Sequence, residues 1–287
     1  MNTYSLKKIC LIISLFLLTT SCTPTNNSQQ QNPTQTIPAA TTPTMALNSF
    51  FDLIFEEKLQ YPEWKAITST IAIKELPITQ NSKRIDVVVV VKLSPEQAEI
   101  SILQDTQKPL FVDEWREQSG AQVVINGNYF QENYHTAGFL KTNGNVFGEI
   151  RSPYDGIFLV ANGKAEVRYL KEKPVKNTAT IEFGITNFPM LIANGKNLLS
   201  GKATEQQRRT AIAQTSEGML LLIVTKRMSL TLAGLTDFLV HSDLSITNAL
   251  NLDGGASTGL SIKTTDFDYN IPSFDQVPNV IVINEQS

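Results

Sequence analysis

Short apolar runs separated by turn residues fill most of this 287-residue chain, and most of the runs have the length of a β-strand. The clearest is the unbroken run of valines at 87–91 within residues 84–93, which is typical of a strand buried on both faces. Further strands are predicted over residues 67–76, 99–103, 121–125, 210–213, 219–225, 249–252 and 280–283. The pattern indicates a strand-rich protein.

Three stretches have helical periodicity instead, namely residues 45–55, 110–118 and 231–240. Gly120 follows the second stretch at the position of a C-cap. Turn dipeptides predict a run of hairpins, at Asn143-Gly144, Asp155-Gly156, Asn162-Gly163, Asn194-Gly195 and Glu217-Gly218. We therefore predict an α+β fold, a single domain with a central mixed β-sheet, several hairpins and two or three packing helices.

The N-terminus has the features of an export signal. Lys7 and Lys8 precede an apolar run, 9–18, that is too short to span a bilayer stably. The following Thr19-Thr20-Ser21-Cys22 resembles the end of a bacterial lipoprotein signal, in which Cys22 is lipidated and becomes the mature N-terminus. Thr19 stands where leucine is usual, so an ordinary secretory signal is the alternative.

The rest of the chain then divides in two. Residues 23–44 are almost free of apolar side chains, which is typical of a disordered tether. Residues 45–287 contain no cysteine and must be stabilised by their core alone. We expect a signal over 1–22, a tether over 23–44 and one domain over 45–287, exported and lipid-anchored in a bacterial cell envelope. The anchor would sit in the outer membrane or on the outer face of the cytoplasmic membrane.

The charge pattern excludes one class of partner. The net charge is −3, and no basic cluster is longer than two residues. Because nucleic-acid binding needs concentrated lysine and arginine, we expect no nucleic-acid partner.

One stretch, residues 248–259, concentrates candidate chemistry. Asp253 would stand at the end of an apolar strand, a position at which ligand sites often lie. Gly254 and Gly255 allow close approach to the backbone, and their N–H groups with Ser257 and Thr258 could receive a phosphate or sugar hydroxyls. A tight Asp-Gly turn without function is the alternative.

Two other places could complete that site. Asn126-Gly127 ends the predicted strand 121–125, and Tyr129 and Phe130 after it offer flat faces that stack on sugar rings. Arg209 begins the predicted strand 210–213 and could hold a phosphate with two hydrogen bonds. Taken singly, Asn126-Gly127 is more often a turn and Arg209 a surface residue.

Other chemistries lack the residues they need. The two histidines, His135 and His241, cannot form a three-histidine metal site, and no G-x-S-x-G motif surrounds a serine. Residues 195–202 resemble a P-loop but have the wrong spacing. Residues 266–270 begin like a calcium loop, yet Ile271 replaces its glycine and Val277 its closing glutamate. No cofactor is predicted with certainty, and a divalent cation such as Ca²⁺ stays open.

Five blocks in matching order resemble the phosphodiester glycosidase family, over residues 85–284. The blocks are the helix around Asp113-Glu114-Trp115 with Val124-Ile125-Asn126-Gly127-Asn128-Tyr129-Phe130, then Gly138, Phe188-Pro189-Met190-Leu191, Arg209-Thr210-Ala211-Ile212, and Asn251-Leu252-Asp253-Gly254-Gly255-Ala256-Ser257-Thr258. Val277-Pro278-Asn279 precedes the last strand as in the family. Ala213 and Ala256 depart from the usual residues, which affects the expected shape of the pocket.

The resemblance implies hydrolysis of a sugar 1-phosphodiester at the sugar C1–O bond. It implies three catalytic residues, Asp253, Arg209 and Asn126, with a glycan or sugar phosphate as substrate. Substrate-binding residues would be Gly127, Tyr129, Phe130, Gly138, Thr210, Gly254, Gly255 and Ser257. Candidates for a second carboxylate are Glu132, Glu149 and Asp155, by position only. The alternative function is a non-catalytic envelope lipoprotein that binds glycan or phosphopolymer, or acts in exopolysaccharide metabolism.

Overall fold

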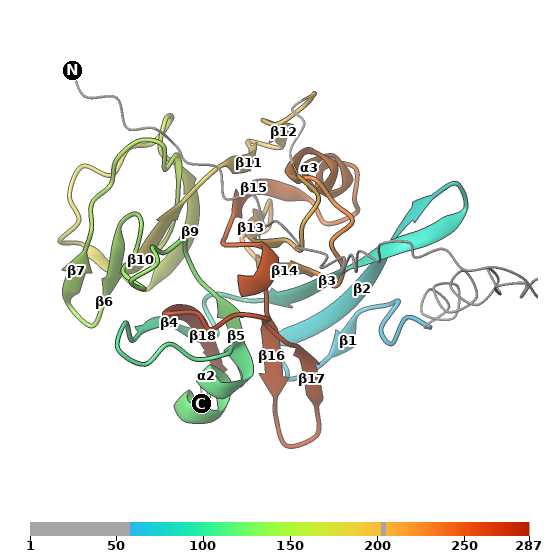
Figure 1. The fold of residues 1–287 in the computed structure, drawn as a ribbon, viewed down its shortest axis with the longest axis horizontal. Coiled ribbons are helices and arrows are strands. Elements are labelled where there is room, and N and C mark those ends of the chain that lie inside the picture. The colour runs from blue at the N-terminus through green and yellow to red at the C-terminus, as the bar shows by residue number, and fades with distance from the viewer. Residues whose placement is uncertain (1–57, 202–204, 287) are drawn as a thin grey trace, which may run out of the picture. The chain divides into compact units, whose positions relative to one another are not determined.

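The computed structural model describes residues 58–201 and 205–286, which belong to one compact unit, residues 47–287 (Figure 1). The predicted signal, tether and helix at 45–55 lie outside the described residues. Within the described residues, no helix has the length and apolar character needed to cross a membrane.

Three β-sheets make up most of this unit. The first has eight strands in the order β1 (Lys65–Ala66), β2 (Ile71–Gln80), β3 (Lys83–Leu93), β14 (Leu220–Thr225), β13 (Thr210–Thr215), β15 (Ile246–Asn251), β11 (Met190–Ala193) and β12 (Lys196–Asn197). The second has the order β7 (Asn145–Phe147), β6 (Leu140–Thr142), β10 (Ile181–Asn187), β8 (Gly156–Ala161) and β9 (Lys164–Tyr169). The third has the order β17 (Asp268–Ile271), β16 (Leu260–Lys263), β5 (Val123–Asn126), β18 (Asn279–Glu285) and β4 (Ala98–Gln104).

The prediction of a mixed sheet is wrong, because every strand pairing among the described residues is antiparallel. Parallel neighbours need long crossover connections, whereas most strands here are joined by tight turns. The described residues contain two α-helices, α2 (Val112–Ser119) and α3 (Leu232–Val240). The fold is therefore more β-rich than the predicted α+β class.

Four of the five predicted hairpin turns are confirmed, and they join β6 to β7, β8 to β9, β11 to β12 and β13 to β14. The fifth is wrong, since Gly156 is the first residue of β8. A Cβ at Gly156 would lie 2.3 Å from Leu250 Cδ1, so close packing explains this glycine. Asp155 Oδ1 accepts the Met190 N–H at 2.7 Å.

Local signals placed both helices correctly. Gly120 caps α2 in the left-handed conformation, with φ of 67°, as the sequence predicts. Thr231 caps α3 at its N-terminus, where the side-chain oxygen accepts the Gly234 N–H at 3.0 Å. The helices pack on the outer faces of two different sheets through Trp115 of α2 and Leu235 of α3.

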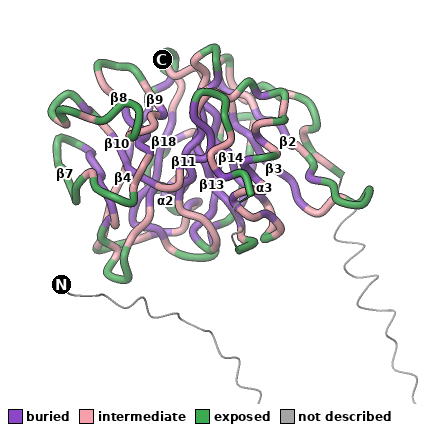
Figure 2. Tube along the Cα trace, turned by 90° about the horizontal axis from the view of Figure 1, so that it is seen from above, coloured by how far each residue is buried: buried purple, intermediate pink, exposed green. Residues whose placement is uncertain are grey.

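One hydrophobic core joins all three sheets. It includes Ile212 of β13, Ile185 of β10 and Ile125 of β5, each from a different sheet. In β3, Val89 faces this core while Val90 faces the cluster beneath α3, which confirms the prediction of a strand buried on both faces. Figure 2 shows the buried residues gathered inside and the exposed ones along the connecting loops.

Removing core volume should destabilise the whole unit. Leu222 of β14 is fully buried in the shared core, so Leu222→Ala should lower the free energy of unfolding by about 2–5 kcal/mol in a urea titration. Met228→Ala is the control, because Met228 is 57% exposed and its truncation should change stability by less than about 0.5 kcal/mol. Equal effects of the two substitutions would contradict the assignment of Leu222 to the core.

Candidate functional site

The sheet register brings the predicted site residues to one edge. β13 and β15 are antiparallel with Ala211 opposite Asn251, so Arg209 before β13 and Asp253 after β15 leave the sheet at the same end. β5 of the third sheet ends nearby, because the Asp253 N–H donates to the Gly127 carbonyl at 3.2 Å. The two strand ends that carry Asn126 and Asp253 therefore meet.

Asn126 holds this junction together. Its Nδ2 donates to the Asp253 carbonyl at 2.8 Å, and its Oδ1 accepts from Thr210 Oγ1 at 2.9 Å and from the Gly259 N–H at 3.1 Å. The side chain is fully buried. Three protein partners thus use the amide, and its place in the structure is to position Asp253 rather than to touch a substrate.

Asp253 is a partly buried carboxylate with a perturbed pKa. The pKa of Asp253 is raised from its ordinary value of 3.8 to about 6, mainly by burial and to a smaller extent by the charge of Asp275. Hydrogen bonds from the Ser257 side chain and from the Gly254 N–H, the latter at 2.9 Å, oppose that rise. A carboxylate with this pKa can exchange a proton near neutral pH, which suits acid–base chemistry.

Tyr129 lies beside this carboxylate. Burial and then the charge of Asp253 raise the pKa of the Tyr129 phenol, so it keeps its proton at neutral pH. Asn251 Nδ2 donates to its oxygen at 2.6 Å, and its ring packs on Phe188 with centroids 5.1 Å apart. The phenol is therefore fixed in place as a hydrogen-bond donor next to Asp253.

Arg209 supplies the positive charge of the site. Its Nε donates to the Leu230 carbonyl at 3.1 Å and its Nη2 to the Glu205 carbonyl. Its Nη1 faces Gly254, since a Cβ there would lie 4.0 Å from that nitrogen. These two bonds use the Nε–H and one Nη2–H, so both Nη1 hydrogens and the second Nη2 hydrogen remain, and the pair of hydrogen bonds to a phosphate stays a prediction.

The two glycines behave differently from the expectation that they would present free N–H groups. The Gly254 N–H donates to Asp253 Oδ1, and the Gly255 N–H donates to the Arg208 carbonyl at 2.8 Å. Gly255 has a φ of 62°, which favours glycine. A Cβ at Gly254 would meet the same carbonyl at 3.0 Å. Conformation and close packing explain both glycines.

Four other residues predicted to bind substrate are packed against, or hydrogen-bonded to, other parts of the protein. Thr210 is fully buried and donates to Asn126. Gly127 has no room for a side chain, because a Cβ would lie 2.0 Å from Asn279 Oδ1, and at Gly138 a Cβ would lie 2.5 Å from Thr186 Oγ1. Phe130 stacks on the ring of Tyr134 with centroids 5.9 Å apart. These four residues shape the scaffold around the site.

None of the three positional candidates for a second carboxylate is the carboxylate whose charge raises the pKa of Asp253. Asp155 accepts a backbone N–H from Met190, Glu149 pairs with Arg151 at 4.0 Å, and Glu132 is exposed. The carboxylate whose charge raises the pKa of Asp253 is Asp275. No sequence motif flags Asp275, and only its place just ahead of Val277-Pro278-Asn279 could have drawn attention to it.

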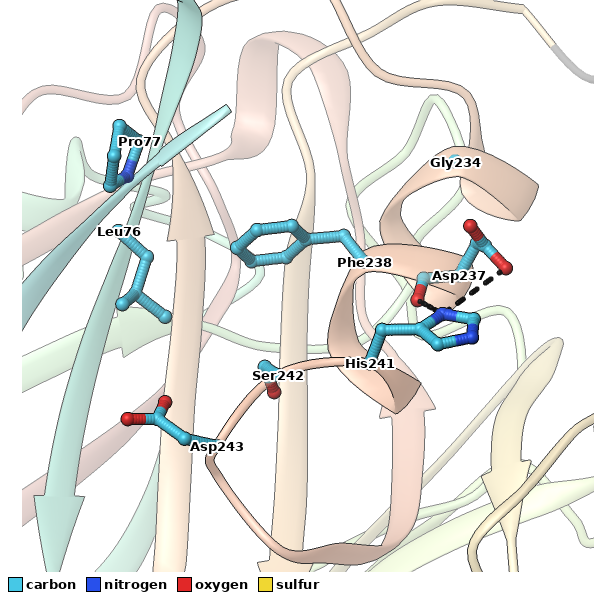
Figure 3. Close-up of a pocket in the computed structure, with 8 residues that line it drawn as sticks. All are labelled: Leu76, Pro77, Gly234, Asp237, Phe238, His241, Ser242 and Asp243. Carbon is cyan, nitrogen blue, oxygen red and sulfur yellow. Dashed lines mark hydrogen bonds and ion pairs between the residues drawn. The ribbon is translucent and has the colours of Figure 1, made fainter. Parts of the chain in front are cut away.

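A hollow of about 460 Å³ lies elsewhere, between β2 and α3 (Figure 3), and contains none of these residues. His241 Nδ1 contacts the Asp237 carbonyl oxygen at 2.8 Å there, as expected for a residue that ends α3. Within the described residues, no three His, Cys, Asp or Glu side chains are grouped as a metal site would require.

Comparison with known protein families confirms the resemblance that the sequence blocks indicate. A family model described as "NAGPA: Phosphodiester glycosidase" matches residues 119–284, which is more than half of the chain. The chain belongs to the phosphodiester glycosidase family. Among curated proteins, no sequence matches it.

Solved structures show the same fold. The catalytic domain of zebrafish N-acetylglucosamine-1-phosphodiester alpha-N-acetylglucosaminidase, auto-inhibited by its pro-peptide, aligns with a TM-score of 0.59 at 18% identity, covering 80% of this chain and 88% of that one. A hypothetical protein from Synechocystis aligns with a TM-score of 0.53 at 14% identity, covering 79% of this chain and 64% of that one. At these identities the likeness establishes the fold alone.

The raised pKa of Asp253 predicts a stability change with a definite sign. The folded state binds the proton more tightly than the unfolded state, so Asp253 lowers stability as pH rises from about 4 to about 6. Asp253→Asn should therefore raise the free energy of unfolding by about 1–3 kcal/mol at pH 8 and have little effect at pH 4.

Urea titrations at the two pH values would measure this difference. Asp237→Asn is the matched control, because the Asp237 side chain is 68% exposed and its loss should not stabilise the protein. A variant at Asp253 no more stable than the wild type at pH 8 would show that the ionised carboxylate is not disfavoured there.

Proposed function

We propose that this protein hydrolyses a sugar 1-phosphodiester, breaking the bond between the sugar C1 and the phosphate oxygen. Water is consumed, and a free sugar and a phosphomonoester are released. The observation that carries the proposal is the convergence of Asp253, with a pKa of about 6, and Arg209 at one sheet edge. Family membership supports this reaction class. N-acetylglucosamine, in the zebrafish protein's name, is the first sugar to test.

The chemistry needs charge neutralisation more than proton donation at the leaving group. A departing phosphate is already stable as an anion, so a fixed cation and hydrogen-bond donors suffice. Arg209, through Nη1, supplies that charge. Tyr129, which keeps its proton, donates a hydrogen bond beside it.

Asp253 acts on the sugar side of the bond. In its ionised form it either takes a proton from the attacking water or stabilises positive charge that develops at C1. Both roles need the carboxylate, so activity should rise as pH increases through about 6. Asn126 assists as a positioning residue, because it holds the Asp253 backbone.

The decisive experiment measures turnover of the methyl phosphodiesters of N-acetylglucosamine, glucose, galactose and mannose. Asp253→Asn should lower kcat by about a thousandfold or more, and Arg209→Gln should lower kcat/KM by about a hundredfold. Asp243→Asn, an exposed residue outside the site, is the matched control and should behave like the wild type. Retained turnover by Asp253→Asn would refute its catalytic role. Saturable binding without product would favour the alternative of a non-catalytic glycan- or phosphopolymer-binding protein, including one in exopolysaccharide metabolism.

We propose in addition that the protein is exported and anchored to a bacterial cell envelope through a lipid on Cys22. The support is the sequence alone: paired lysines, a short apolar run, and small residues ahead of Cys22. Wild-type protein should incorporate labelled fatty acid and partition into detergent, whereas Cys22→Ser should do neither. Cys10→Ser is the matched control and should remain lipidated. Wild-type protein without label, released from the cell after cleavage, would point to the ordinary secretory signal.

A further inference from the structure

We call residues 253–257, which contain Asp253 and the short helical turn after it, the signature turn. A short loop for which the sequence analysis made no prediction borders this turn. The Ala256 carbonyl accepts two N–H groups from this loop, from Phe274 at 2.7 Å and from Asp275 at 3.1 Å. Ala256 belongs to the short helical turn η1 (Gly255–Ser257), three residues after Asp253. Residues 272–276 are therefore held against the turn that carries the candidate catalytic carboxylate.

Arg208 fixes this loop from within the protein. Its Nη1 and Nη2 both donate to the Pro272 carbonyl at 3.0 Å, and its own carbonyl accepts the Gly255 N–H. The residue is only 2% exposed. Burying a guanidinium is costly, and this one donates both of these hydrogen bonds to the loop, while the backbone carbonyl of the same residue holds the turn. Its effect is to hold loop and turn in a fixed relation.

Phe274 is presented outward on this support. Its ring lies over the Arg208 guanidinium, with 4.3 Å from the central carbon to the ring centroid, yet the residue is 65% exposed. Asp275 next to it is also exposed. An aromatic ring held rigid but left in water, with a carboxylate beside it, is the combination that binds sugars, since the ring takes the C–H face and the carboxylate takes hydroxyl hydrogens.

We propose that Phe274 and Asp275 form the subsite for the sugar ring of the substrate, with Arg208 as the positioning residue that supports it. This inference rests on the proposed function and adds an orientation. A phosphodiester has no hydrogen to donate to Asp275 and carries the same charge, so the phosphate belongs at Arg209 and the sugar at Phe274.

Substitutions at Phe274 test the subsite without threatening the fold, because the side chain is mostly exposed. With the full-length protein and the sugar methyl phosphodiesters, Phe274→Ala should raise KM about tenfold while kcat stays within about twofold. Phe274→Tyr keeps the ring and should match the wild type. Met228→Ala, at another exposed apolar residue, is the matched control. Inhibition by inorganic phosphate, which probes the Arg209 side, should be unchanged in all variants.

Each outcome decides the matter. Unchanged KM in Phe274→Ala, or an equal loss of phosphate inhibition, would overturn the subsite while leaving the hydrolase intact. Wild-type protein that cleaves nothing would refute the proposed function, and calorimetric binding of the same diesters then tests the subsite. Binding weakened about tenfold by Phe274→Ala but not by Phe274→Tyr would support it. Equal binding by wild type and variant, or no binding at all, would overturn it.

Discussion

The amide of Asn126 is the contact on which the arrangement of the site depends. It lies where a strand of the third sheet meets the signature turn of the first, and it binds Asp253, Thr210 and Gly259 at once. The reciprocal bond from the Asp253 N–H to the Gly127 carbonyl closes the junction. Because the two sheets also share one hydrophobic core, packing and hydrogen bonding fix the same relative placement.

That junction explains why the Asp253 carboxylate stays at a position where burial disfavours its charge. Asp253 is placed by hydrogen bonds at both its backbone N–H and its carbonyl, which hold the residue where burial disfavours the charge of its side chain. Arg209 is likewise tied by two carbonyls before any ligand arrives. The site is preorganised on both sides.

Sequence reasoning succeeded where the signal was local. Gly120 marks a helix end through its own backbone, and the valines of β3 indicate a strand buried on both faces. It failed where the cause was distant in the chain. The direction of strand pairing, and the packing of Gly156 against Leu250, depend on contacts that no window of residues contains.

The same distinction separates the two arginines of the site. Arg208 and Arg209 are adjacent in sequence, and only the structure shows that one supports the 272–276 loop while the other faces Gly254. Asp275 carries no motif, so its influence on Asp253 could be found only in three dimensions. The sequence predicted that Asn126, Arg209 and Asp253 lie together, and the structure shows which contacts each of them makes.

The tight turns between antiparallel strands have a practical consequence for this fold. The glycines at the tips of the β6–β7, β8–β9 and β13–β14 hairpins, Gly144, Gly163 and Gly218, have open space around them. A buried strand tolerates no cut, but an exposed hairpin tip can be lengthened at small entropic cost. These tips are the natural places to insert an epitope or a fluorescent domain, and so to follow the protein in a living cell without touching its chemistry.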